Sequence, residues 1–266
     1  MSHTEKTAMG KTERKGALAA RLSGLLRERA ARRTVVEVCI GSTYLAVCLD
    51  DGALGLSAVP RAEVPLKIET LPPPPSLAGE NASAVLAWLN EPGRPRRKAV
   101  ALALANALIR QDRSDAEGDA LDLIRLTPAD RIVMVGRFSP LIEKIRVTGA
   151  SLTILEKDAD KGLVLAGRER GAVLRSATVA LITATTLLYD SLEEILDDLG
   201  GARHVTVLGP TTPMLAGLFA GTPVHHLGGV RVVDADRILA IVAAGGGTRA
   251  MRPGVEMTNL WIRRPL

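Results

Sequence analysis

Apolar residues recur along this chain at two spacings, and the order of those spacings predicts its elements. Residues 13–33 carry leucines three and four positions apart, which is typical of an amphipathic helix. Short runs rich in β-branched residues follow, separated by turn residues, and two further helical patterns come after them. We therefore expect strands at 34–40, 43–49 and 53–59, helices at 80–91 and 96–110, and an α+β domain with a basic N-terminal helix over residues 13–112.

Polar residues 111–119 separate this region from a second one with a different pattern. Here short, fully apolar runs alternate with helical patterns, which indicates an α/β fold with a parallel sheet covered on both faces. We expect strands at 131–135, 151–155, 179–183, 205–208 and 224–227, and helices at 139–148, 190–199, 212–220 and 234–244. This second domain is predicted over residues 120–252, with a disordered tail at 1–12 and a C-terminal tail at 253–266.

The composition predicts a packed protein without a membrane segment. Of the 266 residues 47% are hydrophobic and 2% are aromatic, so the core is expected to consist of Ala, Val, Leu and Ile. No apolar run approaches the roughly 20 residues that span a bilayer, and the polar start lacks the apolar segment of a secretory signal. We therefore expect a cytoplasmic protein that does not associate with membranes.

The net charge of +5 comes from one end of the chain. Residues 1–33 hold nine Lys or Arg and three Asp or Glu, so the remainder is nearly neutral. This basic arm has no aromatic residue that could stack on bases. A solvated or packed helix is favoured over an anion-binding arm, and we do not expect a nucleic acid partner.

Cysteine and histidine form no recognisable metal motif. Cys39 and Cys48 lie on neighbouring predicted strands without further ligands nearby, and we expect both to be small buried hydrophobic residues. The adjacent residues His225 and His226 should point to opposite faces of a strand. The sequence also lacks HExxH, GxSxG, Walker and CxxC motifs, so the identity of any metal or cofactor stays open.

Glycine and an acidic residue follow the first two parallel strands, at the edge where open α/β sheets bind ligands. Gly136 and Glu156 occupy the positions at which nucleotide-binding folds place their first glycine and a ribose-binding acid, but the GxGxxG pattern is absent. A nucleotide-like ligand and a simple turn with a surface acid both remain compatible with this pair.

Hydroxyl residues follow the next two strands. Thr185 and Thr186 come after the third strand and would bind an anion or a carbonyl oxygen, or act as capping residues. Gly209, Pro210 and Thr211 follow the fourth strand and place a fixed turn and a hydroxyl group at the same edge. Together these strand ends favour a ligand site at the carboxyl edge of the sheet.

Several stretches, taken in order, resemble one protein family. They are IVMVGRFSPLIEKI (132–145), LTILEKD (152–158), ALITATTLLYDSLEEIL (180–196), VTVLGPTTPML (205–215) and GVRVVDADRILAIVAAGGGTR (229–249), with weaker matches in YLAVCLDDGALGLS (44–57) and KAVALALANALI (98–109). The chain thereby resembles the Rossmann-like family called "putative heavy-metal chelation", whose biochemical activity is unknown. The resemblance implies an enolase N-terminal-like domain followed by a Rossmann-like domain, with a site at their junction.

The resemblance also implies which residues form that site. Carried over one by one, they are Asn106 on the Ala-rich helix, Gly136, Glu156, Thr185, Thr186, Gly209, Pro210, Thr211, Gly229 and Asp234. The family usually has Gly, Asn and Thr around the third strand, where this chain has Ala184, Tyr189 and Ser191. This departure implies altered chemistry at that strand.

Asn106 is also notable without the resemblance. Its amide lies on a helix that is otherwise Ala and Leu, and a buried amide is costly unless it is hydrogen-bonded. We therefore expect Asn106 to bond to the neighbouring domain or to point into a pocket.

The expected function is the binding of a small molecule, in metal homeostasis, at a pocket between the two domains. Glu156 and Asn106 are the candidate catalytic residues: Glu156 would orient a hydroxyl group or act as a base, and Asn106 would close the pocket. An enzyme that makes or processes a metal-binding metabolite is the first hypothesis. A non-catalytic carrier or sensor of a metal chelate or nucleotide-like ligand is the second, and an adenosylmethionine-dependent transferase is the third. A homodimer is the expected assembly.

Overall fold

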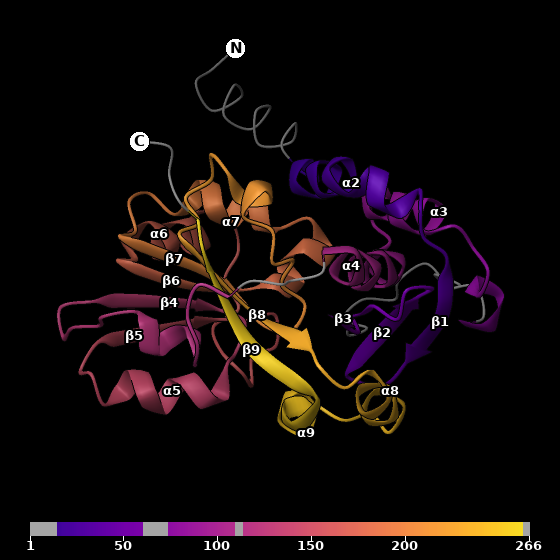
Figure 1. Cartoon of the computed structure of the whole chain (residues 1–266). Helices are drawn as coiled ribbons and strands as arrows, with labels where there is room; N and C mark the ends of the chain where they lie inside the picture. The colour runs from indigo at the N-terminus through magenta and orange to yellow at the C-terminus, as the bar shows by residue number, and fades with distance from the viewer. Residues whose placement is uncertain (1–14, 61–73, 110–113, 263–266) are drawn as a thin grey trace, which may run out of the picture.

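The structure, a computed structural model, describes residues 15–60, 74–109 and 114–262 of the chain. It contains a three-stranded sheet and a six-stranded sheet with helices around both, which confirms the predicted α/β fold class (Figure 1). The tail expected at 1–12 lies outside the described residues. None of the helices formed by the described residues is long and apolar enough to cross a membrane.

The N-terminal unit contains the antiparallel meander that the sequence predicts. Its strands pair in the order β1-β2-β3, and helix α4 packs along β2 and β3. The helix expected at 80–91 is a short α-helix that continues as a 3-10 helix. The elements are α2 (Ala17–Ala30), β1 (Val35–Ile40), β2 (Tyr44–Leu49), β3 (Leu54–Ala58), η1 (Pro74–Leu77), α3 (Ala82–Leu86), η2 (Ala87–Asn90) and α4 (Pro95–Ile109).

The C-terminal unit contains the predicted parallel sheet. Its strand order is β5-β4-β6-β7-β8-β9, with every neighbouring pair parallel except β8 and β9. The elements are η3 (Ala120–Leu123), β4 (Arg131–Val135), α5 (Ser139–Arg146), β5 (Ser151–Leu155), α6 (Gly167–Ser176), β6 (Val179–Thr183), η4 (Ala184–Tyr189), α7 (Leu192–Asp198), β7 (His204–Leu208), η5 (Ala216–Phe219), β8 (His226–Val232), α8 (Ala235–Ala243), α9 (Thr248–Met251), η6 (Arg252–Gly254) and β9 (Val255–Trp261).

Apolar side chains cover both faces of the parallel sheet, as its continuous apolar strands require. Ile132 and Met134 of β4 pack with Leu141 of α5 in one buried cluster. Val133, from the opposite face of the same strand, belongs to a second cluster that also contains Leu102 of α4. This second cluster therefore joins the two units through one continuous core.

Two sequence predictions in the C-terminal unit are wrong. Residues 255–261, expected within a C-terminal tail, form β9, and the side-chain amide of Asn259 donates to the carbonyl oxygens of Ala116 and Gly118 at 3.2 and 2.9 Å. The helix expected at 212–220 is a 3-10 helix restricted to Ala216–Phe219. Pro213 and Gly217 disfavour a longer α-helix there.

Helix α4 lies between the two sheets, directly against β3 (Figure 1). Gly55 makes this close approach feasible, because a Cβ atom at that position would lie 2.1 Å from the carbonyl oxygen of Ala103 and 2.3 Å from the amide nitrogen of Ala107. Both of these atoms belong to the α4 backbone and cannot move independently of the helix. β3 and α4 can therefore lie this close only because Gly55 has no side chain.

Three histidines and Trp261 gather where β7 and β8 begin and β9 ends. The His204 ring lies 5.7 Å from that of His225 and 6.0 Å from that of His226, and the His226 ring lies 4.6 Å from Trp261, between ring centroids. Burial lowers the pKa of both His204 and His226 to about 4. For His204, the proximity of His226, His225 and Arg203 lowers the pKa further, whereas the side chain of Asn259 opposes the effect at His226. Both rings are therefore neutral at pH 7.

Replacement of Gly55 by alanine should push α4 away from β3. We expect Gly55→Ala to lower the free energy of unfolding by about 3 kcal/mol, because the added methyl group meets backbone atoms. Gly24→Ala, within α2 and with nothing near its Cβ position, should instead raise it by about 0.5–1 kcal/mol. Urea denaturation of both variants measures the difference, and equal effects would contradict the packing constraint.

Acid should destabilise the fold through the histidine cluster. The folded-state pKa of His204 and His226 lies below the unfolded value of 6.5. The two neutral rings therefore contribute fully to the free energy of unfolding above pH 6.5, and this contribution is lost as the pH falls toward 4. Each histidine should contribute about 3 kcal/mol over this interval. Urea denaturation between pH 4 and 7 measures the slope, and His204→Gln should reduce it. An unchanged slope in that variant would show that His204 titrates normally.

Candidate functional site

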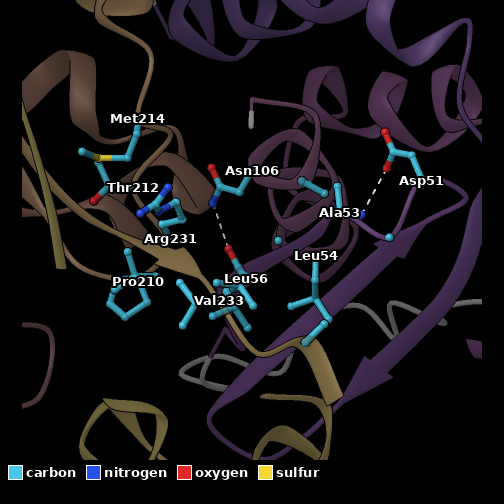
Figure 2. Close-up of a pocket in the computed structure, with 16 residues that line it drawn as sticks. Asp51, Ala53, Leu54, Leu56, Asn106, Pro210, Thr212, Met214, Arg231 and Val233 are labelled. Carbon is cyan, nitrogen blue, oxygen red and sulfur yellow. Dashed lines mark hydrogen bonds between the residues drawn. The ribbon is translucent and has the colours of Figure 1, made fainter. Parts of the chain in front are cut away.

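A pocket of about 340 Å³ lies between the two units, where β3 and α4 approach the carboxyl ends of β7 and β8 (Figure 2). Helix α4 contributes Asn106, the turn after β7 contributes Pro210 and Thr212, and β8 contributes Arg231. The pocket is therefore located at the junction and at the sheet edge where the sequence analysis places the site. It is lined by Asp51, Gly52, Ala53, Leu54, Gly55, Leu56, Asn106, Ala107, Pro210, Thr212, Met214, Val230, Arg231, Val232, Val233 and Ala235.

The amide of Asn106 connects the two units. Its Nδ2 donates to the carbonyl oxygen of Leu56 at 2.8 Å and to that of Thr211 at 3.1 Å. Since both neighbours are acceptors, the amide nitrogen must face them and the oxygen must face elsewhere. This oxygen, Oδ1, is buried and has no hydrogen-bond partner among the described residues.

Thr211 and Thr212 are adjacent in the chain but differ in their surroundings. The Thr211 hydroxyl oxygen accepts a hydrogen bond from the backbone amide of Ala58 at 2.9 Å, which is a second polar contact between the units. Thr212 is also buried, but its Oγ1 has no partner within the described part of the chain. Thr211 therefore supports the pocket, whereas Thr212 offers it a free hydroxyl group.

Arg231 supplies the positive charge of the pocket. Its guanidinium group pairs with Glu256, which lies opposite it on β9. Gly229, two residues earlier on β8, lies against Met214: a Cβ atom at Gly229 would be 2.5 Å from the Met214 sulfur. The predicted site residue Gly229 thus contributes space for a pocket side chain rather than a direct contact.

The remaining predicted site residues lie apart from this pocket. Glu156 accepts hydrogen bonds from the backbone amides of Arg137 at 2.7 Å and Lys157 at 3.2 Å. Gly136 has a φ of 85°, and a Cβ atom there would lie 2.6 Å from Cγ2 of Thr183. Glu156 and Gly136 therefore sit at the ends of β5 and β4, and their roles in ligand binding stay predictions.

The hydroxyl groups after β6 bond within their own turn. Thr185 Oγ1 lies 3.0 Å from Thr183 Oγ1, and Thr186 donates to the Thr183 carbonyl oxygen at 2.7 Å. The capping residue of this turn is Thr183, whose hydroxyl oxygen accepts from the backbone amide of Thr185 at 3.3 Å. These threonines do not line the pocket.

Gly209 and Asp234 have local structural roles. Gly209 adopts a φ of 115°, which favours glycine, and its amide donates to the Gly228 carbonyl oxygen at 3.0 Å. Asp234 caps α8 by accepting from the amide of Arg237 at 3.0 Å. Of the predicted residues, the structure brings Asn106 and Pro210 together in the pocket wall.

Sequence reasoning missed Thr212, Met214 and Arg231. Thr212 follows a predicted residue directly, but the choice between two adjacent threonines depends on the path of the turn. Arg231 comes two residues after the Gly228-Gly229 pair. A charged residue this close to two glycines in a strand was the feature of the sequence that indicated an exposed strand end.

The described residues do not fit a bare metal ion. Among residues 15–60, 74–109 and 114–262 there is no group of three or more His, Cys, Asp or Glu side chains placed to hold one. Cys39 and Cys48 are free, and burial raises the pKa of both thiols, which disfavours the thiolate that binds metals.

The fold and the pocket define a two-unit α/β protein with a candidate ligand site between an antiparallel and a mainly parallel sheet. The chain belongs to the family described as "Putative heavy-metal chelation". Residues 119–260 match the family model DUF364, and residues 24–109 match a second family model with the same description, DUF4213. The suspected family is thereby confirmed.

Solved structures and a relative agree with this assignment. The structure of a DUF364 protein of unknown function from Pyrococcus horikoshii has a TM-score of 0.80 at 18% identity, covering 92% of this chain and 99% of that chain. A second, from Desulfitobacterium hafniense, has a TM-score of 0.71 at 19% identity, covering 90% and 98%. An uncharacterized protein of Methanocaldococcus jannaschii is 26% identical over 112 residues, which are 41% of this chain and 43% of that relative. These likenesses support the fold.

The two adjacent threonines should respond differently to the same substitution. Thr211→Val leaves the amide of Ala58 unpaired and should lower the free energy of unfolding by about 1–3 kcal/mol. Thr212→Val removes a buried hydroxyl that has no partner within residues 15–60, 74–109 and 114–262, so stability should stay within about 0.5 kcal/mol or rise. Thermal and urea denaturation of the two variants test this. A large loss in Thr212→Val would mean that its hydroxyl already has a partner.

Proposed function

We propose that this protein binds a small polar organic molecule in the pocket between its two units, as a carrier or sensor in metal homeostasis. The observation that carries the proposal is that two buried polar atoms, Asn106 Oδ1 and Thr212 Oγ1, have no partner among the described residues and belong to side chains that line the same pocket. A buried polar group without a hydrogen bond costs about 1–3 kcal/mol. A ligand that bonds to both atoms would remove this cost.

The pocket groups limit the chemistry of the ligand. Asn106 Oδ1 requires an N–H or O–H donor, whereas the Thr212 hydroxyl can donate or accept. Arg231 lines the pocket and would favour a negative group there, although Glu256 offsets part of its charge. These requirements favour a polar molecule with an amide, amine or hydroxyl group and an acidic end.

A binding role has more support than a catalytic one. The only acidic side chain among the pocket residues is Asp51, which bonds to the amide of Ala53 at 3.1 Å and to the guanidinium group of Arg33 at 2.7 Å. A carboxylate held in this way is poorly placed to accept a proton from a ligand. The candidate base Glu156 does not line the pocket, so the enzyme hypothesis has no acid–base group there.

A metal would enter this pocket as cargo, through donor atoms of the ligand. The family description refers to chelation, whereas the described part of the chain lacks a three-donor cluster. A metal chelate held through its organic part satisfies both observations. The ligand screen must therefore contain metal–ligand pairs as well as separate components.

The test is thermal denaturation of the full chain with a panel of adenosyl and nicotinamide cofactors, pterins, flavins and divalent metals, each alone and in metal–ligand pairs. A ligand that binds only the folded state should raise stability by about 2.7 kcal/mol at a hundredfold excess over its Kd. Thr212→Val should remove the shift, because it deletes a pocket hydroxyl without disturbing the fold.

Glu156→Ala is the matched control, since Glu156 lies at the same sheet edge but outside the pocket. The proposal expects this variant to keep the ligand-induced shift. Loss of the shift in Glu156→Ala and its retention in Thr212→Val would move the site to the ends of β4 and β5. A shift with metals alone, unchanged in both variants, would also contradict the proposal.

A further inference from the structure

One wall of the pocket is the open edge of β3. Successive residues of a strand direct their backbone N–H and C=O groups to opposite edges. Ala53 and Val59 bond toward β2, as the contacts Leu49 N to Ala53 O and Val59 N to Thr43 O show, both at 2.9 Å. The even-numbered residues of β3 therefore face away from β2.

The outward direction of these even-numbered residues is visible in their contacts. The Leu56 carbonyl oxygen accepts from Asn106, and the Ala58 amide donates to Thr211 in the other unit. The C=O of Leu54 and the N–H of Leu56 face this same edge, and neither has a hydrogen-bond partner among the described residues. They form a donor and an acceptor directed at the pocket.

The other wall is the end of β8, which extends past its neighbour β7. The parallel register ends at the pair Leu208 and Gly228, followed by one bond from the Gly209 amide to the Gly228 carbonyl oxygen. Beyond it, β8 pairs only with β9, through odd-numbered residues such as Val233, whose amide donates to Gly254 at 3.0 Å. Val230 and Val232 therefore direct their backbone groups away from β9, without partners in the described part of the chain.

The two open edges line the same pocket, yet β3 and β8 belong to different sheets and do not pair (Figure 2). Side chains of both strands meet on one side: Leu54 and Leu56 are in a cluster with Val242 of α8, against which Val230 and Val232 pack. Asn106 of α4 lies on the other side. The pocket is therefore a slot between the edges of β3 and β8, with α8 on one side and α4 on the other.

We propose that this slot binds a short peptide in extended conformation, which pairs with β3 on one side and β8 on the other. The segment Leu54–Leu56 spans about 7 Å at 3.3–3.4 Å per residue, so the slot accommodates about three residues. Main-chain groups of the peptide satisfy Leu54, Leu56, Val230 and Val232, as in strand addition to a sheet edge. This inference rests on the proposed function, because it assigns a ligand class to the same pocket.

The side chains around the slot fit the remaining parts of such a peptide. Asn106 Oδ1 accepts from a peptide N–H or an amino group, and Arg231 lies where a terminal carboxylate would gain a charged partner. Pairing with both strand edges requires main-chain N–H and C=O groups that point in opposite directions, which successive residues of an extended peptide provide. The required ligand is therefore a peptide with at least one internal amide.

The probe is trialanine, added at millimolar concentration to the ¹⁵N-labelled full chain. Binding should shift the backbone amide resonances of Leu56 and Val232 and slow their hydrogen exchange, because both N–H groups become hydrogen-bonded. Trialanine that is N-methylated at the central residue should bind about tenfold more weakly, since it lacks one main-chain donor. Equal affinity of the two peptides would overturn the pairing.

Val232→Pro is the matching protein variant. Proline removes the N–H that faces the slot but leaves the β8–β9 bonds intact, because Val232 does not bond toward β9. Val232→Ala keeps this N–H and is the control for the side chain. We expect the proline variant to lose at least tenfold in affinity for trialanine and the alanine variant to keep it; equal affinities would contradict the proposal. If the proline variant unfolds, hydrogen exchange at the Leu56 amide of the unmodified chain tests the pairing instead: exchange that trialanine does not slow would contradict the proposal.

The outcomes separate this inference from the proposed function. If a compound of the ligand panel binds in a Thr212-dependent manner while trialanine leaves the Leu56 and Val232 amides unchanged, the peptide inference falls and the proposed function stands. If neither the panel nor trialanine binds, both fall. Slowed exchange at both amides, with weaker binding of the N-methylated peptide, supports both.

Discussion

The close contact of α4 with β3 is the constraint on which the candidate site depends. Because Gly55 has no side chain, the α4 backbone lies directly on β3, and Asn106 reaches the carbonyl oxygens of Leu56 and Thr211. These two carbonyl groups belong to different units. One amide thus fixes the turn after β7 relative to β3, and its own oxygen has no partner in the part of the chain that the structure describes. The same geometry that joins the units creates the polar character of the pocket.

A second set of contacts holds the units together on the side of α7. Lys98 of α4 forms a buried ion pair with Asp190, which adopts a left-handed φ of 51° at the end of η4. Nearby, Glu193 of α7 accepts a hydrogen bond from the amide of Leu18, in the first turn of α2, at 2.9 Å. A buried ion pair adds little net stability but is costly to break. Lys98 and Asp190 therefore restrict the relative orientation of the units, and with it the distance between β3 and β8.

Burial on both faces made the parallel sheet predictable, since β4, β6 and β7 are nearly continuous apolar runs. Helix α6 was not predicted, because its sequence, GRERGAVLRS, is mostly polar and has no continuous apolar run. Strand β9 was not predicted either, because its buried residues Thr258 and Asn259 are polar. Asn106 was predictable as an amide among Ala and Leu. The open edges of β3 and β8 were not, because backbone groups have no residue-specific signal and their exposure depends on how far each neighbouring strand extends.

Unpaired groups in a folded protein are informative when they converge. Side-chain atoms of Asn106 and Thr212, and main-chain groups of Leu56 and Val232, come from four separate segments and line the same pocket. Other buried side-chain atoms without hydrogen-bond partners among the described residues, such as Nε of Arg170, lie outside the pocket. In the pocket, Thr211 and Asn106 Nδ2 connect the walls, and the groups between those walls are available. Under the proposed function, a ligand with complementary donors and acceptors would recover the stability lost by leaving these groups unpaired.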